Sequence, residues 1–237
     1  MKRVDGIRAV TYDCWGTLLK DRDWEGAYKI RVSALSRSLG IDEEDAKGLI
    51  DDAWARHDDA WKQVETFGPG RMAAYCLEMR GVFDDDRIAE LTRQFEEASI
   101  QCGVDAVEGA RETLAALQTA GLGRALVCDT GFTPGRVVRQ FLDDNGLLEY
   151  LDVLCFSDEV GVPKPGPDIF AKALAELGVR PPEAVHIGDL RRTDIAGAHD
   201  IGMHAIRFKG FHDDRSDAPE ARIVISDHTE LLEILNL

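Results

Sequence analysis

Short apolar runs alternate with helical segments along most of the chain, and this alternation constrains the fold more than any other feature. Six runs have the length and composition of buried strands: Ile7–Tyr12, Arg124–Cys128, Val153–Phe156, Ala184–Ile187, His204–Phe208 and Arg222–Ile225. Helical patterns lie between them at Val107–Ala120, Asp168–Leu177 and Thr193–Ile201, and each is followed by a glycine, as is typical of helix C-termini. Strands separated by helices pair in parallel, so the sequence predicts an α/β fold with a doubly wound parallel sheet.

The stretch between the first two strand-like runs is different, because residues 20–103 contain almost no strand pattern. Apolar residues recur there at helical spacing, with breaks at Leu39–Ile41, Phe67–Gly70 and Gly81–Asp84. We therefore expect three or four helices that form an inserted α-helical cap, with hinges near Leu18–Asp23 and Gln101–Gly103. The predicted domains are a core of residues 1–19 and 104–237 and a cap of residues 20–103.

Charge and composition limit the partners and the compartment. Lys and Arg total 28 against 44 Asp and Glu, and this net charge of −16 disfavours nucleic acid and anionic membranes as partners. No window approaches the roughly 18 consecutive apolar residues of a membrane span, and the N-terminus lacks a signal-peptide pattern. The five cysteines form no CxxC pair, so we expect reduced thiols in a cytoplasmic protein. Whether the chain forms a homodimer stays open, because nothing in the sequence sets the oligomeric state.

Polar residues gather where four of the strand-like runs end. The carboxyl ends of parallel strands share one edge of an open sheet, and ligands bind at that edge. The residues at the ends of the runs are Asp13, Cys128–Thr130, Ser157–Lys164 and Asp189. Taken singly, such residues have ordinary structural roles, since an aspartate commonly caps a turn or a helix and a loop lysine is commonly solvated. Their convergence on one edge predicts a functional site.

The order of these clusters resembles the haloacid dehalogenase-like superfamily. Its nucleophile motif matches Asp13-Cys14-Trp15-Gly16-Thr17, its lysine motif matches Lys164, and its acidic motif matches Asp189 and Asp194 in the phrase GDLRRTDIAGAHDIGM. The resemblance covers residues 7–17 and about 105–235, and the helical insertion stands where the family places a cap. It implies a Rossmann-like core and hydrolysis that begins with attack by an aspartate. Most members are magnesium-dependent phosphatases, and a minority cleave carbon–halogen bonds.

The resemblance implies a role for each matching residue. Asp13 is the nucleophile, and Lys164 is a catalytic cation beside it. The implied Mg²⁺ site uses Asp13, Asp189, the backbone carbonyl of Trp15 and, through water, Asp194; the implied substrate-binding residues are Thr17, Cys128, Asp129 and Thr130. A carboxylate nucleophile and an anionic substrate repel each other, so a hard divalent cation and a lysine are suited to offset that repulsion. The expected substrate is a small anionic molecule, a phosphorylated metabolite in the first instance.

Two positions depart from the family pattern. Family phosphatases carry a second Asp two residues after the nucleophile, which protonates the leaving group and activates water, whereas Trp15 can do neither. Loss of a general acid/base costs about 10²–10⁴-fold in rate, so Trp15 disfavours alcohol phosphate esters and favours good leaving groups such as acyl phosphates. Cys128 stands where the family has a substrate-binding hydroxyl. Either Cys128 or the nearby Thr130 takes that role, or Cys128 only packs in the core.

Trp15 leaves three other functions open. An aromatic residue there resembles the 2-haloacid dehalogenase branch, in which a halide leaves without a proton. The chain nevertheless keeps Gly188-Asp189 where that branch has Ser-Asn, and its Ile41–Asp45 stretch is acidic where the branch has an arginine. Phosphonate hydrolases also lack the second Asp and use a cap lysine, for which the candidates are Lys29, Lys47 and Lys62. The third is a catalytically weak relative that binds a metabolite or a protein.

Overall fold

The structure, a computed structural model, describes residue 4 and residues 6–237. It divides into two compact units. The first contains the chain up to Lys20 together with Asp105–Asp129 and Arg139–Leu237, and the second contains Asp21–Val104 and Thr130–Val138. Each unit has an apolar core of its own.

The first unit is built on a six-stranded sheet with the order β5-β4-β1-β6-β7-β8, in which every neighbouring pair is parallel. The strands are β1 (Ala9–Tyr12), β4 (Gly123–Cys128), β5 (Val153–Phe156), β6 (Ala184–Gly188), β7 (His204–Phe208) and β8 (Ile223–Ile225). Each coincides with a run predicted from the sequence, with small shifts at the ends. The predicted α/β fold, a Rossmann-like doubly wound parallel sheet, is therefore confirmed.

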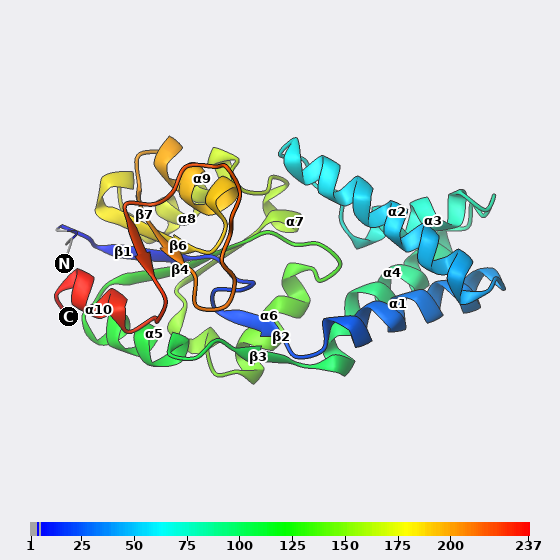
Figure 1. Cartoon of the computed structure of the whole chain (residues 1–237), viewed down its shortest axis with the longest axis horizontal. Helices are drawn as coiled ribbons and strands as arrows, with labels where there is room; N and C mark the ends of the chain where they lie inside the picture. The colour runs from blue at the N-terminus through cyan, green and yellow to red at the C-terminus, as the bar shows by residue number, and fades with distance from the viewer. Residues whose placement is uncertain (1–3, 5) are drawn as a thin grey trace. The chain divides into compact units, whose positions relative to one another are not determined.

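Helices cover both faces of this sheet. They are α5 (Ala110–Thr119), α7 (Ser157–Val160), α8 (Pro167–Leu177), α9 (Ala196–Asp200) and α10 (Glu230–Leu235). A further helix, α6 (Gly135–Asp144), begins in the second unit and ends in the first. Figure 1 shows α8 and α9 on one face of the sheet and α5 and α10 on the other. Ile169 and Phe170 of α8 are fully buried in one cluster with Val127 and Cys155. Burial on both faces explains why the strands read as continuous apolar runs.

The second unit is helical. Its helices are α1 (Trp24–Leu39), α2 (Glu43–Lys62), α3 (Pro69–Glu78) and α4 (Asp85–Cys102), separated at the breaks predicted from the sequence. Three of them begin at an aspartate whose carboxylate accepts a backbone amide of the first turn: Asp23, Asp42 and Asp84. Among residue 4 and residues 6–237, no helix combines the length and apolarity that crossing a bilayer requires.

The segment Thr130–Val138 packs with the second unit, although the sequence-based boundaries assign it to the core. The reason is Phe132. Its ring stacks on Trp54 at 5.3 Å between centroids and meets Phe95 edge-on at 5.5 Å. The Arg31 guanidinium lies 4.6 Å from the Phe132 ring centre. These contacts give the short segment an aromatic anchor in the helical unit.

Two short strands that the sequence did not indicate lie where the chain leaves and re-enters the first unit. They are β2 (Leu19–Asp21) and β3 (Val104–Ala106), and they pair with each other. The predicted hinge Leu18–Asp23 contains β2, and the predicted hinge Gln101–Gly103 covers the end of α4 and lies directly before β3. A three-residue strand has too few residues to show an alternating pattern, so sequence periodicity does not detect it.

Candidate active site

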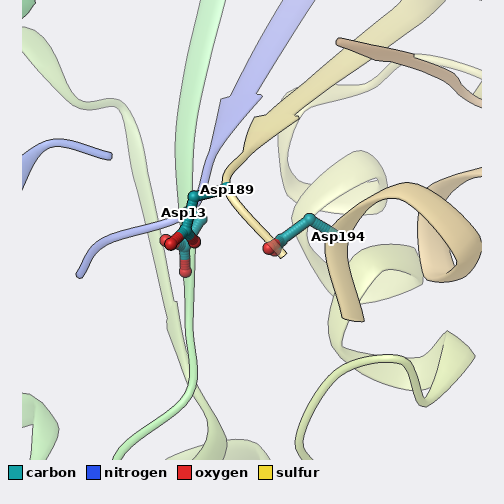
Figure 2. A group of neighbouring side chains, drawn as sticks. All are labelled: Asp13, Asp189 and Asp194. Carbon is teal, nitrogen blue, oxygen red and sulfur yellow. The ribbon is translucent and has the colours of Figure 1, made fainter. Parts of the chain in front are cut away.

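Two aspartates extend neighbouring strands at the same edge of the sheet. Asp13 follows β1 and Asp189 follows β6, and the Asp13 amide donates to the Ile187 carbonyl at 2.8 Å, which continues the parallel ladder up to the site. Asp194 lies in the helical turn after β6. Figure 2 shows the Asp13 and Asp189 carboxylates together, with the carboxylate of Asp194 directed toward them. Each residue offers an oxygen within 4.8 Å of the others.

Lys164 joins this group from the loop that follows α7. The lysine is 1% exposed, and its Nζ lies 2.5 Å from Oδ1 of Asp13 and 2.7 Å from Oδ1 of Asp194. Its backbone amide donates to Oδ1 of Asp129 at 2.8 Å, which ties the lysine loop to the end of β4. Lys164 is therefore held by hydrogen bonds at both its backbone amide and its ammonium group.

Two glycines make room for the acidic side chains. A Cβ atom on Gly16 would lie 2.9 Å from Oδ2 of Asp189, and the φ of Gly16 is +79°. A Cβ atom on Gly188 would lie 2.3 Å from Cγ of Asp194. Both positions therefore need glycine, because any side chain would displace a carboxylate of the site.

The buried charges are not balanced by the protein alone. Burial raises the pKa of Asp13 to about 6, although Lys164 opposes the rise. Burial raises the pKa of Asp189 to about 9, and the carboxylates of Asp13 and Asp194 add to the increase. The pKa of Lys164 lies well above its ordinary value, because these acidic neighbours outweigh the effect of burial. Three carboxylates thus share one ammonium group.

This donor set fits Mg²⁺. Oδ2 of Asp13 is buried and has no hydrogen-bond partner among the described residues. A hard cation with a preference for carboxylate oxygens would satisfy that atom and relieve the repulsion that raises the pKa of Asp189. Within residue 4 and residues 6–237, Asp13, Asp189 and Asp194 form the group of acidic side chains with metal-ligand spacing.

Asp194 is already engaged by other side chains. Its Oδ1 accepts from Lys164 and lies 3.1 Å from Nε2 of His186, and its Oδ2 accepts the Leu190 amide at 3.0 Å. Burial acts to raise the pKa of Asp194, but Lys164 and His186 outweigh it and hold that pKa below its usual range. The other ring nitrogen of His186 lies 2.7 Å from the hydroxyl of Thr11. Asp194 therefore positions Lys164, and His186 contributes to the site although no sequence motif indicates it.

The remaining predicted residues of the nucleophile motif lie in the loop after β1. Trp15 is half-buried, and its ring meets Phe141 edge-on at 6.3 Å between centroids. Thr17 is fully buried, its hydroxyl has no partner among the described residues, and its carbonyl oxygen lies 2.8 Å from Nε2 of His228. Nothing in the tryptophan ring replaces the missing carboxylic acid.

The three residues at the end of β4, Cys128 to Thr130, lie in different environments. Cys128 is fully buried, and its thiol contacts the thiol of Cys14, which is fully buried as well. Burial raises the pKa of the Cys128 thiol well above its ordinary value. Asp129 holds the Lys164 backbone, and Thr130 is buried in the segment that packs with the second unit. The burial of Cys128 is typical of a thiol that packs in a core.

Known proteins share both the sequence and the fold. The sequence profile of the haloacid dehalogenase-like hydrolases matches residues 7–202. The haloacid dehalogenase-like hydrolase domain-containing protein 3 of Bos taurus is 34% identical over 216 residues, which is 86% of this chain and 82% of that protein. The glyceraldehyde 3-phosphate phosphatase of Pyrococcus furiosus is 36% identical over 134 residues, 54% of each chain.

Solved structures give the same grouping. A HAD phosphatase from Thermococcus onnurineus superposes with a TM-score of 0.68 at 25% identity and covers 96% of this chain and 97% of its own. A 2-haloacid dehalogenase from Pseudomonas syringae shares the fold with a TM-score of 0.70 at 23% identity, over 96% of this chain and 97% of its own. The fold alone therefore does not distinguish a phosphatase from a dehalogenase. The sequence match, however, is extensive enough to identify the family. This chain belongs to the haloacid dehalogenase-like hydrolase family.

Proposed function

We propose that the chain is a Mg²⁺-dependent phosphohydrolase that acts on a small phosphorylated metabolite with Asp13 as its nucleophile. One observation carries the proposal. A carboxylate oxygen of Asp13 lies 2.5 Å from the buried ammonium of Lys164, while its second oxygen has no partner among the described residues. Asp13, Asp189 and Asp194 each offer an oxygen within 4.8 Å of the others. The names of relatives such as the glyceraldehyde 3-phosphate phosphatase support a phosphorylated substrate.

The proposed reaction has two displacements. The Asp13 carboxylate attacks phosphorus, the bond from phosphorus to the leaving oxygen breaks, and an aspartyl phosphate forms. Water then attacks that phosphorus, which releases inorganic phosphate and restores Asp13. Mg²⁺, held by Asp13, Asp189 and the Trp15 carbonyl, would supply positive charge against the phosphoryl oxygens. Lys164 keeps one Asp13 oxygen oriented and adds a fixed positive charge, and Asp194 holds Lys164 in place.

Trp15 narrows the proposed substrate class. A poor leaving group needs a proton as it departs, and a tryptophan ring has no acid to donate it. We therefore expect acetyl phosphate to be hydrolysed more efficiently than a simple alkyl phosphate, by about 10²-fold or more. The measurement is kcat/KM for both compounds with Mg²⁺ and with EDTA. Equal efficiency for the two would show that an acid from elsewhere replaces the missing aspartate.

The nucleophile is tested by Asp13→Asn, which keeps the shape of the side chain and removes its charge. Turnover should fall to background with every phosphorylated substrate, while Lys172→Met, an exposed change on α8, should leave it intact. Full activity in Asp13→Asn, or turnover that survives metal removal, would rule out the proposed mechanism.

Trp15 is also the observation that favours a second candidate, a 2-haloacid dehalogenase. A halide leaves without a proton, so that reaction does not need an acid at this position. It predicts halide release from a chlorinated acid that EDTA does not affect. A protein retained for binding alone would show neither reaction and would not gain stability from Mg²⁺.

A further inference from the structure

His228 lies 211 residues from Thr17 in sequence and contacts the loop that carries the nucleophile. It precedes α10, is fully buried, and its Nε2 lies 2.8 Å from the Thr17 carbonyl oxygen. A carbonyl can only accept, so Nε2 carries the proton and donates it. Nδ1 has no partner among the described residues, and burial lowers the pKa of the ring. The imidazole is therefore a neutral donor with one assigned tautomer.

Two carbonyl groups close the loop Asp13–Leu19 on itself, and one of them, the Leu19 carbonyl, accepts the Gly16 amide at 2.7 Å. The Cys14 carbonyl accepts the amides of Thr17, Leu18 and Leu19 at 3.3, 2.8 and 2.9 Å. These bonds shape the turn, but they all lie inside it. The bond from His228 holds the Thr17 peptide from outside the loop. The neighbouring Gly16 approaches Asp189 closely, so a shift of this peptide would alter the acidic group of the site.

His228 is itself held rigidly, as a positioning residue must be. Its ring stacks on Phe208 with 4.3 Å between centroids and 18° between planes, and lies 6.1 Å from the ring of Tyr12. Its backbone is fixed on both sides. The Asp227 carboxylate accepts the Thr229 amide at 2.7 Å, and Oε1 of Glu230 accepts the Asp227 amide at 2.9 Å. Ring and backbone contacts together leave the donor little freedom.

We propose that His228 is a positioning residue, whose Nε2–H sets the Thr17 peptide and thereby the loop that presents Asp13 to substrate. The structural part of this proposal stands on contacts within the first unit. Its catalytic part rests on the proposed function. His228 does not touch the reacting atoms in this role, and it acts through the backbone of the loop.

Two substitutions separate the hydrogen bond from the packing of the ring. His228→Phe keeps a ring beside Phe208 and removes the donor, whereas His228→Gln removes the ring and can present an amide N–H toward Thr17. In His228→Phe, amide exchange of Thr17–Leu19 should accelerate about fivefold, which is the worth of one net hydrogen bond, and kcat should fall. His228→Gln should restore both toward wild type while lowering Tm more than His228→Phe. The matched control is His199→Phe at an exposed position of α9.

Each outcome bears on the proposal. Wild-type exchange in His228→Phe, or equal acceleration in both variants, overturns the role of the donor. Faster exchange without a change in kcat overturns the catalytic part. If the wild-type protein hydrolyses no phosphorylated compound, the proposed function fails, and the exchange measurements still decide whether His228 positions the loop.

Discussion

At the scale of single residues, the site holds buried acids whose pKa values move in opposite directions. The pKa of Asp13 is raised to about 6 and that of Asp189 to about 9, whereas the pKa of Asp194 is lowered. Burial outweighs the contact of Asp13 with Lys164 and also raises the pKa of Asp189, whereas Asp194 contacts both Lys164 and His186. Asp13 and Asp189 therefore stabilise the folded state at acidic pH, whereas Asp194 stabilises it at pH values above the ordinary pKa of an aspartate.

Without metal, the stability of the protein should fall as pH rises from about 4 to about 9. A raised acid pKa means that the folded state holds a proton that the unfolded state has lost, so Asp13 and Asp189 contribute stability below their ordinary pKa and lose it as pH rises through about 6 and about 9. Asp194 contributes in the opposite sense and loses its contribution only on strong acidification. Melting curves from pH 5 to 9 measure the effect. Mg²⁺ should abolish the alkaline loss, and a pH-independent Tm without metal would contradict the assigned shifts.

Lys164→Met should destabilise the metal-free protein strongly. It removes the ammonium from two buried carboxylates, and breaking a buried ion pair on one side costs about 3–5 kcal/mol. Urea denaturation reports the change in free energy of unfolding. Lys172→Met removes an exposed lysine paired with Glu176 and should leave stability nearly unchanged. Equal stability of the two variants would show that Lys164 is not needed to hold the acids.

At the scale of elements, the loop after β1 depends on one glycine. Gly16→Ala forces an alanine into the left-handed region, at a cost of about 1–2 kcal/mol, and places a Cβ atom against Asp189. Gly121→Ala meets the same backbone restriction at φ +73° with no atom within 4 Å of its Cβ. Both should lose similar stability, but only Gly16→Ala should lose Mg²⁺ affinity, as measured by calorimetry. Normal Mg²⁺ affinity in Gly16→Ala would place the metal elsewhere.

The elements also show how far sequence reasoning reaches. The six strands were predictable because both faces of the sheet are buried, so each strand is an apolar run, and glycines mark the helix ends. The convergence of Asp13, Lys164 and Asp189 followed from parallel topology alone. Phe132 gave no such signal, because its partner Trp54 is distant in sequence and the loop has no periodicity. His228 was also missed, since a lone histidine before a short C-terminal helix has no pattern that indicates its contact with Thr17.

At the scale of the whole molecule, the two units have separate apolar cores, and the acidic group lies in the first of them. A ligand stabilises only the part of a protein that binds it, by about 2.7 kcal/mol at a hundred times its Kd. Mg²⁺ should therefore shift the calorimetric transition of the first unit and leave the second where it is. A shift of equal size in both units would show that they unfold as one cooperative structure.

The position of β1 in the sheet has a consequence for synthesis on the ribosome. β1 is made before the other strands of the six-stranded sheet, yet it is central, and its neighbours begin only at Gly123 and Ala184. The contacts within α1 to α4 are local by comparison, and local contacts form fastest. The helical insertion should thus acquire structure while the strand that carries Asp13 is still unpaired, and pulse-labelled stalled chains should show protection in residues 24–102 before residues 9–12. Asp13, the proposed nucleophile, would then be among the last groups of the first unit to reach its working environment, so an incomplete chain would be inert until β6 had emerged.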